Sequence, residues 1–334
     1  MKSPLKSPLA FVVAAFALLA LYPLLGGAYG MDLVAKMMIY AVFALSLELL
    51  VGGTGLVCFG QAAFFGAGAY AAVRLSPADA PAALVWLLPL SIGAGALLAL
   101  MVGALSLRTR GVYFIMVTLA FAQMAYYVVH DTALGGGTDG IYLYFKPTLG
   151  ALDLDDADVM YGLILACLVF TFAFLAVLRR SRFGRALAGI KANEVRMRAS
   201  GFSTYPYKLA AFTLSGAIAA LAGFLFALKD GFVNPELLSW HFSGAVLVMI
   251  ILGGLGHLRG ALIGAFAFTL LQELFKSEAI FGALAKHWML GLGLAIIGCV
   301  ALLPRGLVGI PAQWREGRAR REARAASGAA RAAP

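Results

Sequence analysis

The sequence predicts an all-α polytopic membrane protein with about ten transmembrane helices and a coupling helix on the cytoplasmic side. Of its 334 residues, 62% are hydrophobic and 13% are charged, about half the charged fraction of a soluble domain. Ten runs with few or no charges are each about long enough to cross a ~30 Å hydrocarbon layer as a helix. A basic segment of about 30 residues, 179–208, separates two of these runs and is too long to be a tight turn.

The predicted spans succeed one another along the whole chain. Lys2 and Lys6 before the first run also fit a cleaved signal peptide, which would leave nine spans. The run is longer than a signal core, so we expect it to be retained as a span. The ten spans are 9–27, 33–51, 56–73, 82–107, 112–129, 158–178, 209–228, 240–255, 258–275 and 284–303.

The positions of the basic residues predict that both termini face the cytoplasm. In this orientation the inside loops and termini hold 20 of the 26 Lys and Arg residues, as the positive-inside rule requires. The same asymmetry explains the net charge of +10 without a nucleic-acid partner. Residues 1–310 then form one transmembrane domain that includes the segment 179–208. We expect 311–334 to be a disordered basic tail that binds acidic lipid.

Motifs for catalysis, nucleotides or metals are missing or in the wrong context. The loop 135–140 matches GxGxxG, but it follows a span instead of a strand. No Gly-Lys pair exists, so the chain has no P-loop. Four scattered histidines and three cysteines in apolar segments lack metal-ligand or disulfide patterns. We therefore expect a chain that is not an enzyme and that binds no cofactor and no metal.

Glycines and charges mark unusual places within the spans. Two GGxG turns, beginning at Gly52 and Gly253, indicate either a weak internal repeat or two independent packing sites. The glycines after Gly52 fit close helix packing or a helix broken beside a pathway. We expect Glu48 to extend toward the inner surface, with a role in the pathway as the alternative. The spans lack the chain of buried carboxylates that a carrier coupled to a proton or sodium gradient would use. Energy would therefore have to enter elsewhere, and the basic segment 179–208 is the obvious place.

Several motifs together resemble one known family over about 37–309. They are GGTGL at 52–56, FGQAAFFG at 59–66, GAY at 68–70, LRTRGVYF at 107–114, TLAF at 118–121, GGTDG at 136–140, SRFGRA at 181–186, Asn193-Glu194, Gly201, Lys208, LGGLG at 252–256 and PRGL at 304–307. On these motifs the chain resembles the permease subunits of ATP-binding-cassette importers for branched-chain amino acids, in their LivM-like branch. Cys58 and Arg259 depart from the pattern, at positions where a serine and an apolar residue are expected.

The resemblance implies a five-part importer in the bacterial inner membrane. This subunit would pair with a second, similar permease, with two cytoplasmic ATPase subunits that hold ATP and Mg²⁺, and with a periplasmic substrate-binding protein. The segment 182–199 resembles the coupling helix that docks into the ATPase, and an amphipathic helix lying on lipid is the alternative. The residues expected to couple are Arg182, Phe183, Gly184, Arg185, Leu187, Ile190, Lys191, Asn193, Glu194 and Gly201.

The family also implies a path for a branched-chain or related hydrophobic amino acid. The residues expected to line it are Gly53, Gly55, Phe59, Gln61, Phe64, Gly66, Phe114, Thr118 and Gln123, with Ser215 as a further hydrogen-bonding group. A permease of a urea or short-chain amide importer is the alternative within this class. A secondary carrier would transport solute without ATPase subunits, and a membrane enzyme would need a catalytic constellation that the sequence does not contain.

Overall fold

The computed structural model describes residues 8–24, 27–77, 80–133, 135–148, 154–303 and 306–309. Each of the ten predicted spans contains an α-helix. These helices are α1 (Pro8–Leu21), α2 (Ala28–Thr54), α3 (Gln61–Leu75), α4 (Leu84–Ser106), α5 (Val112–Asp131), α6 (Ala157–Arg180), α9 (Thr204–Asp230), α10 (Trp240–Gly253), α11 (Leu258–Lys276) and α13 (Trp288–Leu302). The predicted tail, 311–334, lies outside the described residues.

Seven segments of the described chain are long and apolar enough to cross a membrane. Six of them are α2, α4, α5, α6, α9 and α11, and the seventh, Ala285–Gly309, contains α13. Helices α1, α3 and α10 have 14, 15 and 14 residues, too few to cross a ~30 Å layer alone. The prediction of an all-α polytopic membrane protein is confirmed, with three of the ten predicted spans outside these seven segments.

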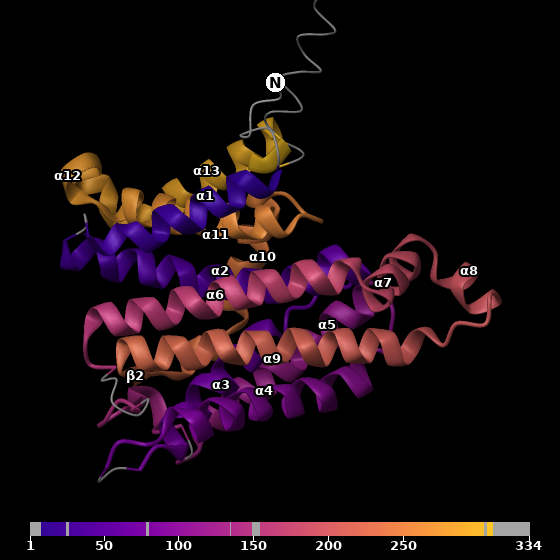
Figure 1. Ribbon diagram of the computed structural model, residues 1–334, viewed down its shortest axis with the longest axis horizontal. Helices are drawn as coiled ribbons and strands as arrows, with labels where there is room; N and C mark the ends of the chain where they lie inside the picture. The colour runs from indigo at the N-terminus through magenta and orange to yellow at the C-terminus, as the bar shows by residue number, and fades with distance from the viewer. Residues whose placement is uncertain are drawn as a thin grey trace, which may run out of the picture.

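The core of the bundle is built around α2 and α9. Every side chain of α2 from residue 37 to residue 51 is buried. Helix α9 packs against α2, α3 and α4, and α11 packs against α2 and α10 (Figure 1). Helices α1 and α13 lie at one edge of the view, and α3 and α4 lie at the other. A helix apolar on all sides suits such a central position.

The two ends of the bundle differ (Figure 1). Helices α7 (Arg182–Ala192) and α8 (Glu194–Ala199) project at one end, which we call the α7 end. At the other end, which we call the sheet end, β1 (Ile141–Tyr142) pairs antiparallel with β2 (Phe232–Val233). The loop 135–140 leads into β1, whereas a dinucleotide site needs a strand leading into a helix. The remaining short elements are α12 (Glu278–Phe281), η2 (Tyr22–Leu24), η3 (Gly137–Asp139), η4 (Pro235–Leu238), η5 (Gly282–His287) and η6 (Leu307–Gly309).

Glycines allow the central helices to approach backbone to backbone. A Cβ added at Gly223 of α9 would overlap the carbonyl oxygen of Phe65 on α3. On the other side of the bundle, a Cβ at Gly264 of α11 would overlap the carbonyl oxygen of Met249 on α10. Backbone atoms cannot move aside as a flexible side chain can, so these positions require glycine for packing.

Replacing Gly223 with alanine should destabilise the protein by about 1–3 kcal/mol, because α3 and α9 must separate. Thermal unfolding of the purified protein in detergent measures the effect. Gly93 of α4 has no atom within 4 Å of an added Cβ, so Gly93→Ala is the matched control and should leave the melting temperature nearly unchanged. Equal melting temperatures for the two variants would contradict the packing argument.

The third span is broken near the α7 end. Helix α2 ends at Thr54, the following Gly55 has a left-handed φ of 77°, and α3 begins only at Gln61. The intervening residues are not helical, so the prediction of a span from residue 56 places the helix start too early. The N–H of Phe59 donates to Thr118 Oγ1 of α5 at 3.3 Å, and the N–H of Ala62 donates to Ser243 Oγ of α10 at 2.9 Å. Non-helical backbone within a membrane needs such partners inside the protein.

Candidate functional site

Helix α7 is amphipathic, and its apolar face is held by the bundle. Ser181 caps the start of the helix: its Oγ accepts a hydrogen bond from the N–H of Gly184 at 3.3 Å. This bond satisfies one of the N–H groups that have no partner in the first helical turn. Leu187 and Ile190 are buried within this chain, whereas Arg182 and Arg185 are exposed. The two apolar residues therefore anchor α7 to its own subunit, and the basic side chains occupy the outer face.

The predicted helix over 182–199 is two helices in the structure. Asn193 is extended, with φ of −163°, and separates α7 from α8. Its side-chain oxygen accepts the N–H of Arg196 at 2.9 Å, so the asparagine caps α8 and does not continue α7. Gly201, with φ of 84°, follows α8 and turns the chain toward α9.

Glu194 ties α8 to the start of α9. Its Oε1 accepts hydrogen bonds from Lys208 Nζ at 2.8 Å and from Thr204 Oγ1 at 2.9 Å, and it also pairs with Arg198. Burial raises the pKa of Glu194, but these hydrogen bonds outweigh it and lower the pKa to about 2. Glu194 is therefore ionised at neutral pH, and the corner between α8 and α9 is fixed by charge.

Lys191 connects α7 to the end of α2. Its Nζ donates to the carbonyl oxygen of Gly52 at 3.0 Å, in the last turn of α2. The carbonyls of a last helical turn lack partners within the helix, and a cation there interacts favourably with the helix dipole. At the other end of α7, a Cβ on Gly184 would overlap the carbonyl oxygen of Leu178 in α6. Thus α7 is in direct contact with both α2 and α6.

A buried ion pair lies beside this contact. The side chain of Glu48 is 0% exposed, and its Oε1 lies 3.5 Å from a guanidinium nitrogen of Arg179. The same guanidinium donates to the carbonyl oxygen of Gly256 at 2.9 Å. Gly52, one turn after Glu48, leaves the space that the carboxylate fills. The expectation that Glu48 extends to the surface is wrong, because Arg179 and the space at Gly52 hold it inside.

The basic segment thus touches both GGxG turns. Lys191 binds the turn that begins at Gly52, and Arg179 binds the turn that begins at Gly253. Beside these contacts, a cavity of about 150 Å³ lies between α7, α6 and the end of α2. Sequence reasoning missed this junction because it treated the glycine turns and the basic segment as separate features.

Gln61, expected to line the path, lies in the core. Its Nε2 donates to Ser46 Oγ at 2.8 Å and to Ser215 Oγ at 2.9 Å, and Ser215 Oγ in turn donates to the carbonyl oxygen of Ser46. These groups join α2, α3 and α9 within the described part of the chain. Their hydrogen-bonding capacity is directed into the bundle, where a buried polar group needs partners.

Apart from Gln123, the other expected path residues fall into three groups. Phe64 and Phe114 are buried and both pack edge-on against Phe212, with ring centroids 5.5 and 6.1 Å apart. Thr118 accepts a hydrogen bond from the N–H of Phe59, which is half-buried and lies in the non-helical part of the third span. Gly53 and Gly55 lie at the end of α2, and Gly66 makes space for Leu238.

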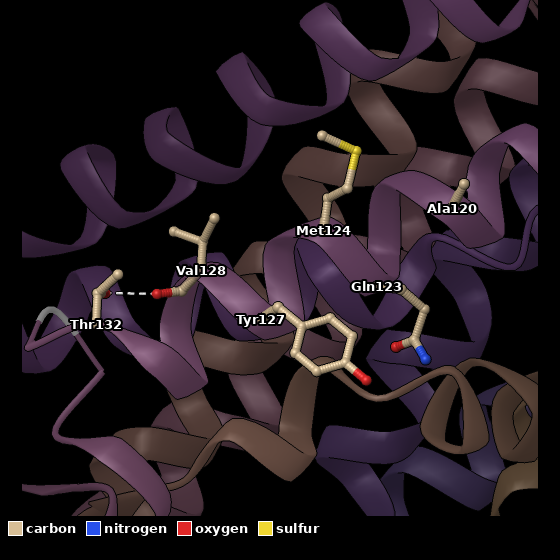
Figure 2. A pocket seen from close by; sticks show the side chains of 6 residues that line it. All are labelled: Ala120, Gln123, Met124, Tyr127, Val128 and Thr132. Carbon is tan, nitrogen blue, oxygen red and sulfur yellow. Dashed lines mark hydrogen bonds between the residues drawn. The ribbon is translucent and has the colours of Figure 1, made fainter.

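Gln123 lies in a shallow, open hollow on the surface of α5 (Figure 2). Gln123 and Tyr127, one turn apart, project to the same side of the helix. Met124 and Tyr127 are 61% and 55% exposed. Sequence reasoning included Gln123 and missed Met124 and Tyr127, although their spacing along one helical face was visible in the sequence. The remaining lining residues are Ala120, Val128 and Thr132.

Comparisons with known proteins identify a family and several transport permeases that this chain resembles. Residues 30–300 match the family model described as branched-chain amino acid transport system / permease component. The permease protein LivM of the high-affinity branched-chain amino acid transport system of Escherichia coli (strain K12) is 29% identical over 323 residues, covering 89% of this chain and 74% of LivM. The fructose import permease protein FruG of Bifidobacterium longum is 25% identical over 279 residues, covering 80% of this chain and 79% of FruG. No solved structure matches.

Proposed function

We propose a transport function from one premise: this chain belongs to the family of branched-chain amino acid transport system permease components. It is a multi-pass membrane protein, and its relatives are transport permeases, not enzymes. In the proposed function this subunit forms half of the translocation pathway of an ATP-binding-cassette importer. A second, similar permease completes the pathway.

The proposed substrate is a branched-chain or related hydrophobic amino acid. The relative aligned over 89% of this chain is named for branched-chain amino acids, which supports this class. FruG is named for fructose, so substrates differ among the relatives. We favour the amino acid over urea or a short amide because both the family model and LivM, aligned over 89% of this chain, are named for branched-chain amino acids. An external substrate-binding protein would deliver the substrate and select it.

The proposed orientation puts the α7 end in the cytoplasm of a bacterium, with the protein in the inner membrane. Arg179 and Arg180 end α6 there, and Arg182 and Arg185 follow in α7. Such a concentration of arginine is typical of a cytoplasmic loop. Two ATPase subunits that hold ATP and Mg²⁺ would dock on the exposed basic face of α7. Both chain termini would then also be cytoplasmic.

One observation carries the proposed coupling: Lys191 and Arg179 bind the two glycine turns. When the ATPase pair closes and moves α7, the hydrogen bond from Lys191 moves the end of α2, which leads directly into the broken third span. Arg179 passes motion of the α6–α7 junction to the turn between α10 and α11. The corner at Glu194 keeps α8 and α9 aligned with the moving helix.

The proposed path follows the open face of α5. The hollow at Gln123 has the right chemistry for a zwitterion with an apolar side chain, since Gln123 offers an amide and Met124 offers an apolar surface. The equivalent face of the second permease would close the hollow into a pathway. Among the described residues that line it there is no Asp, Glu, Lys, Arg or His, which suits a substrate without net charge.

The test is uptake by the reconstituted five-part complex in proteoliposomes. Labelled leucine should enter only when ATP, both ATPase subunits and the binding protein are present. Uptake driven by an ion gradient with this chain alone would identify a secondary carrier and contradict the proposal.

Lys191→Ala should lower the number of leucine molecules imported per ATP hydrolysed about tenfold, because a hydrogen bond to a charged group is lost at the junction. Arg196→Ala is the matched control, since it removes one positive charge from the neighbouring exposed helix α8. It should retain near-normal import per ATP. Equal losses in the two variants would show that general charge, and not the contact with Gly52, matters.

A further inference from the structure

A second pocket at the α7 end gathers positive charge from two distant parts of the chain. It has a volume of about 360 Å³ and lies between α1, α6 and the turn that precedes α11. Arg179 and Arg180 come from the last turn of α6, and His257 and Arg259 come from the start of α11. The pocket is separate from the cavity beneath α7 and from the hollow on α5.

The charge of this pocket is not neutralised by the surrounding protein. Arg179 is paired with Glu48, but among the described residues no carboxylate lines the pocket or forms an ion pair with Arg180 or Arg259. The first N–H groups of α11 lie at the same place, and the start of a helix carries partial positive charge. An anion in the pocket would therefore meet two arginines and the end of a helix dipole.

Apolar side chains form the rest of the pocket. Val12 of α1, Phe172 of α6 and Leu258 of α11 line it next to the arginines. On α6, Val169 lies one turn before Phe172 on the same face of the helix and is exposed, so apolar side chains continue along α6 from the pocket. The pocket is thus charged on one side and continuous with a surface suited to hydrocarbon on the other, which fits an amphiphile better than a small free anion.

We propose that this pocket binds the phosphate headgroup of an anionic phospholipid, with an acyl chain along the apolar face of α1 and α6. Basic pockets between transmembrane helices recognise such headgroups. The inference goes beyond the proposed transport function and rests on the pocket alone. Arg179 lines the pocket and also contacts Glu48 and Gly256, so the bound lipid stabilises the guanidinium that joins α6 to the turn before α11.

Lipid binding to the full chain tests the proposal. The purified protein is titrated in mild detergent with phosphatidylglycerol or phosphatidylcholine, and retained lipid is measured by native mass spectrometry. We expect phosphatidylglycerol to bind the double variant Arg180→Gln/Arg259→Gln about 30-fold more weakly than the unchanged protein, from the loss of two charges. Arg108→Gln/Arg110→Gln is the matched control, because it removes two arginines from the loop between α4 and α5, and it should bind normally.

Two further measurements make the result decisive. Arg180→Lys/Arg259→Lys keeps the charges and should retain most phosphatidylglycerol, and inorganic phosphate at millimolar concentration should not displace the lipid. The proposal is overturned if the glutamine double variant and its control bind alike, if phosphatidylcholine binds equally well, or if phosphate alone displaces the lipid. None of these readouts depends on ATPase subunits, so a failure here is distinct from a failure of the transport proposal.

Discussion

Replacing Gly184 with alanine will reduce ATP-driven uptake by the reconstituted importer about tenfold or more. The added Cβ would overlap the carbonyl oxygen of Leu178 and approach Cα and the carbonyl oxygen of Arg179 at 2.7 Å. All three are backbone atoms of α6, so α7 must tilt away from the bundle. The tilt separates Lys191 from Gly52 and breaks the junction through which we propose that motion of the ATPase subunits reaches α2.

Gly189→Ala provides the control for this prediction. It makes the same chemical change on the same helix, but its added Cβ meets only the flexible side chain of Met197. Uptake by this variant should stay within about twofold of the unchanged protein, since a terminal thioether can move aside. Both variants should insert into the membrane in equal amounts. Normal uptake by Gly184→Ala would contradict the proposal that the position of α7 governs coupling.

Replacing Arg179 with methionine should destabilise the protein by about 3–5 kcal/mol. The change leaves the completely buried carboxyl of Glu48 without its positive partner, so the carboxyl must either stay ionised without compensation or take up a proton, and it also removes the hydrogen bond to Gly256. Thermal or denaturant unfolding in detergent would measure the loss. A large downward shift in melting temperature is the expected result.

The double variant Glu48→Gln/Arg179→Met should recover most of this stability. A neutral amide replaces the isolated carboxylate, so the remaining deficit is about 1–2 kcal/mol from the lost hydrogen bond to Gly256. Glu48→Gln alone should have a small effect, because Arg179 is partly exposed to water. If the single and double variants were equally unstable, the buried charge would not be the cause, and Arg179 would act through Gly256 alone.

Features determined by local pattern could be predicted from the sequence. Uncharged runs located all ten helical segments, because a span of about 20 apolar residues is a local property. The start of α7 after Ser181 was also predictable, since a serine cap precedes an amphipathic run. The break at Asn193 was missed, although a residue that often caps helices stands there.

Features determined by tertiary partners could not be predicted. Glu48 resembled a residue near a membrane surface until Arg179, more than 130 residues later in the sequence, was placed beside it. Gln61 resembled a polar group in a path, but Ser46 and Ser215 from two other helices satisfy its Nε2. Neither partnership leaves a periodic signal, because each depends on how helices distant in sequence pack.

The break in the third span determines what holds the start of α3. Its first peptide groups are held by one hydroxyl of Thr118 and one of Ser243, outside any helical hydrogen-bond ladder. Such a bond contributes about 1 kcal/mol net, little more than the thermal energy. Exchanging these two hydroxyls for water or for neighbouring acceptors would therefore free the residues before α3 without unwinding a helical turn, while the close contact of Gly223 with Phe65 keeps α3 packed on α9.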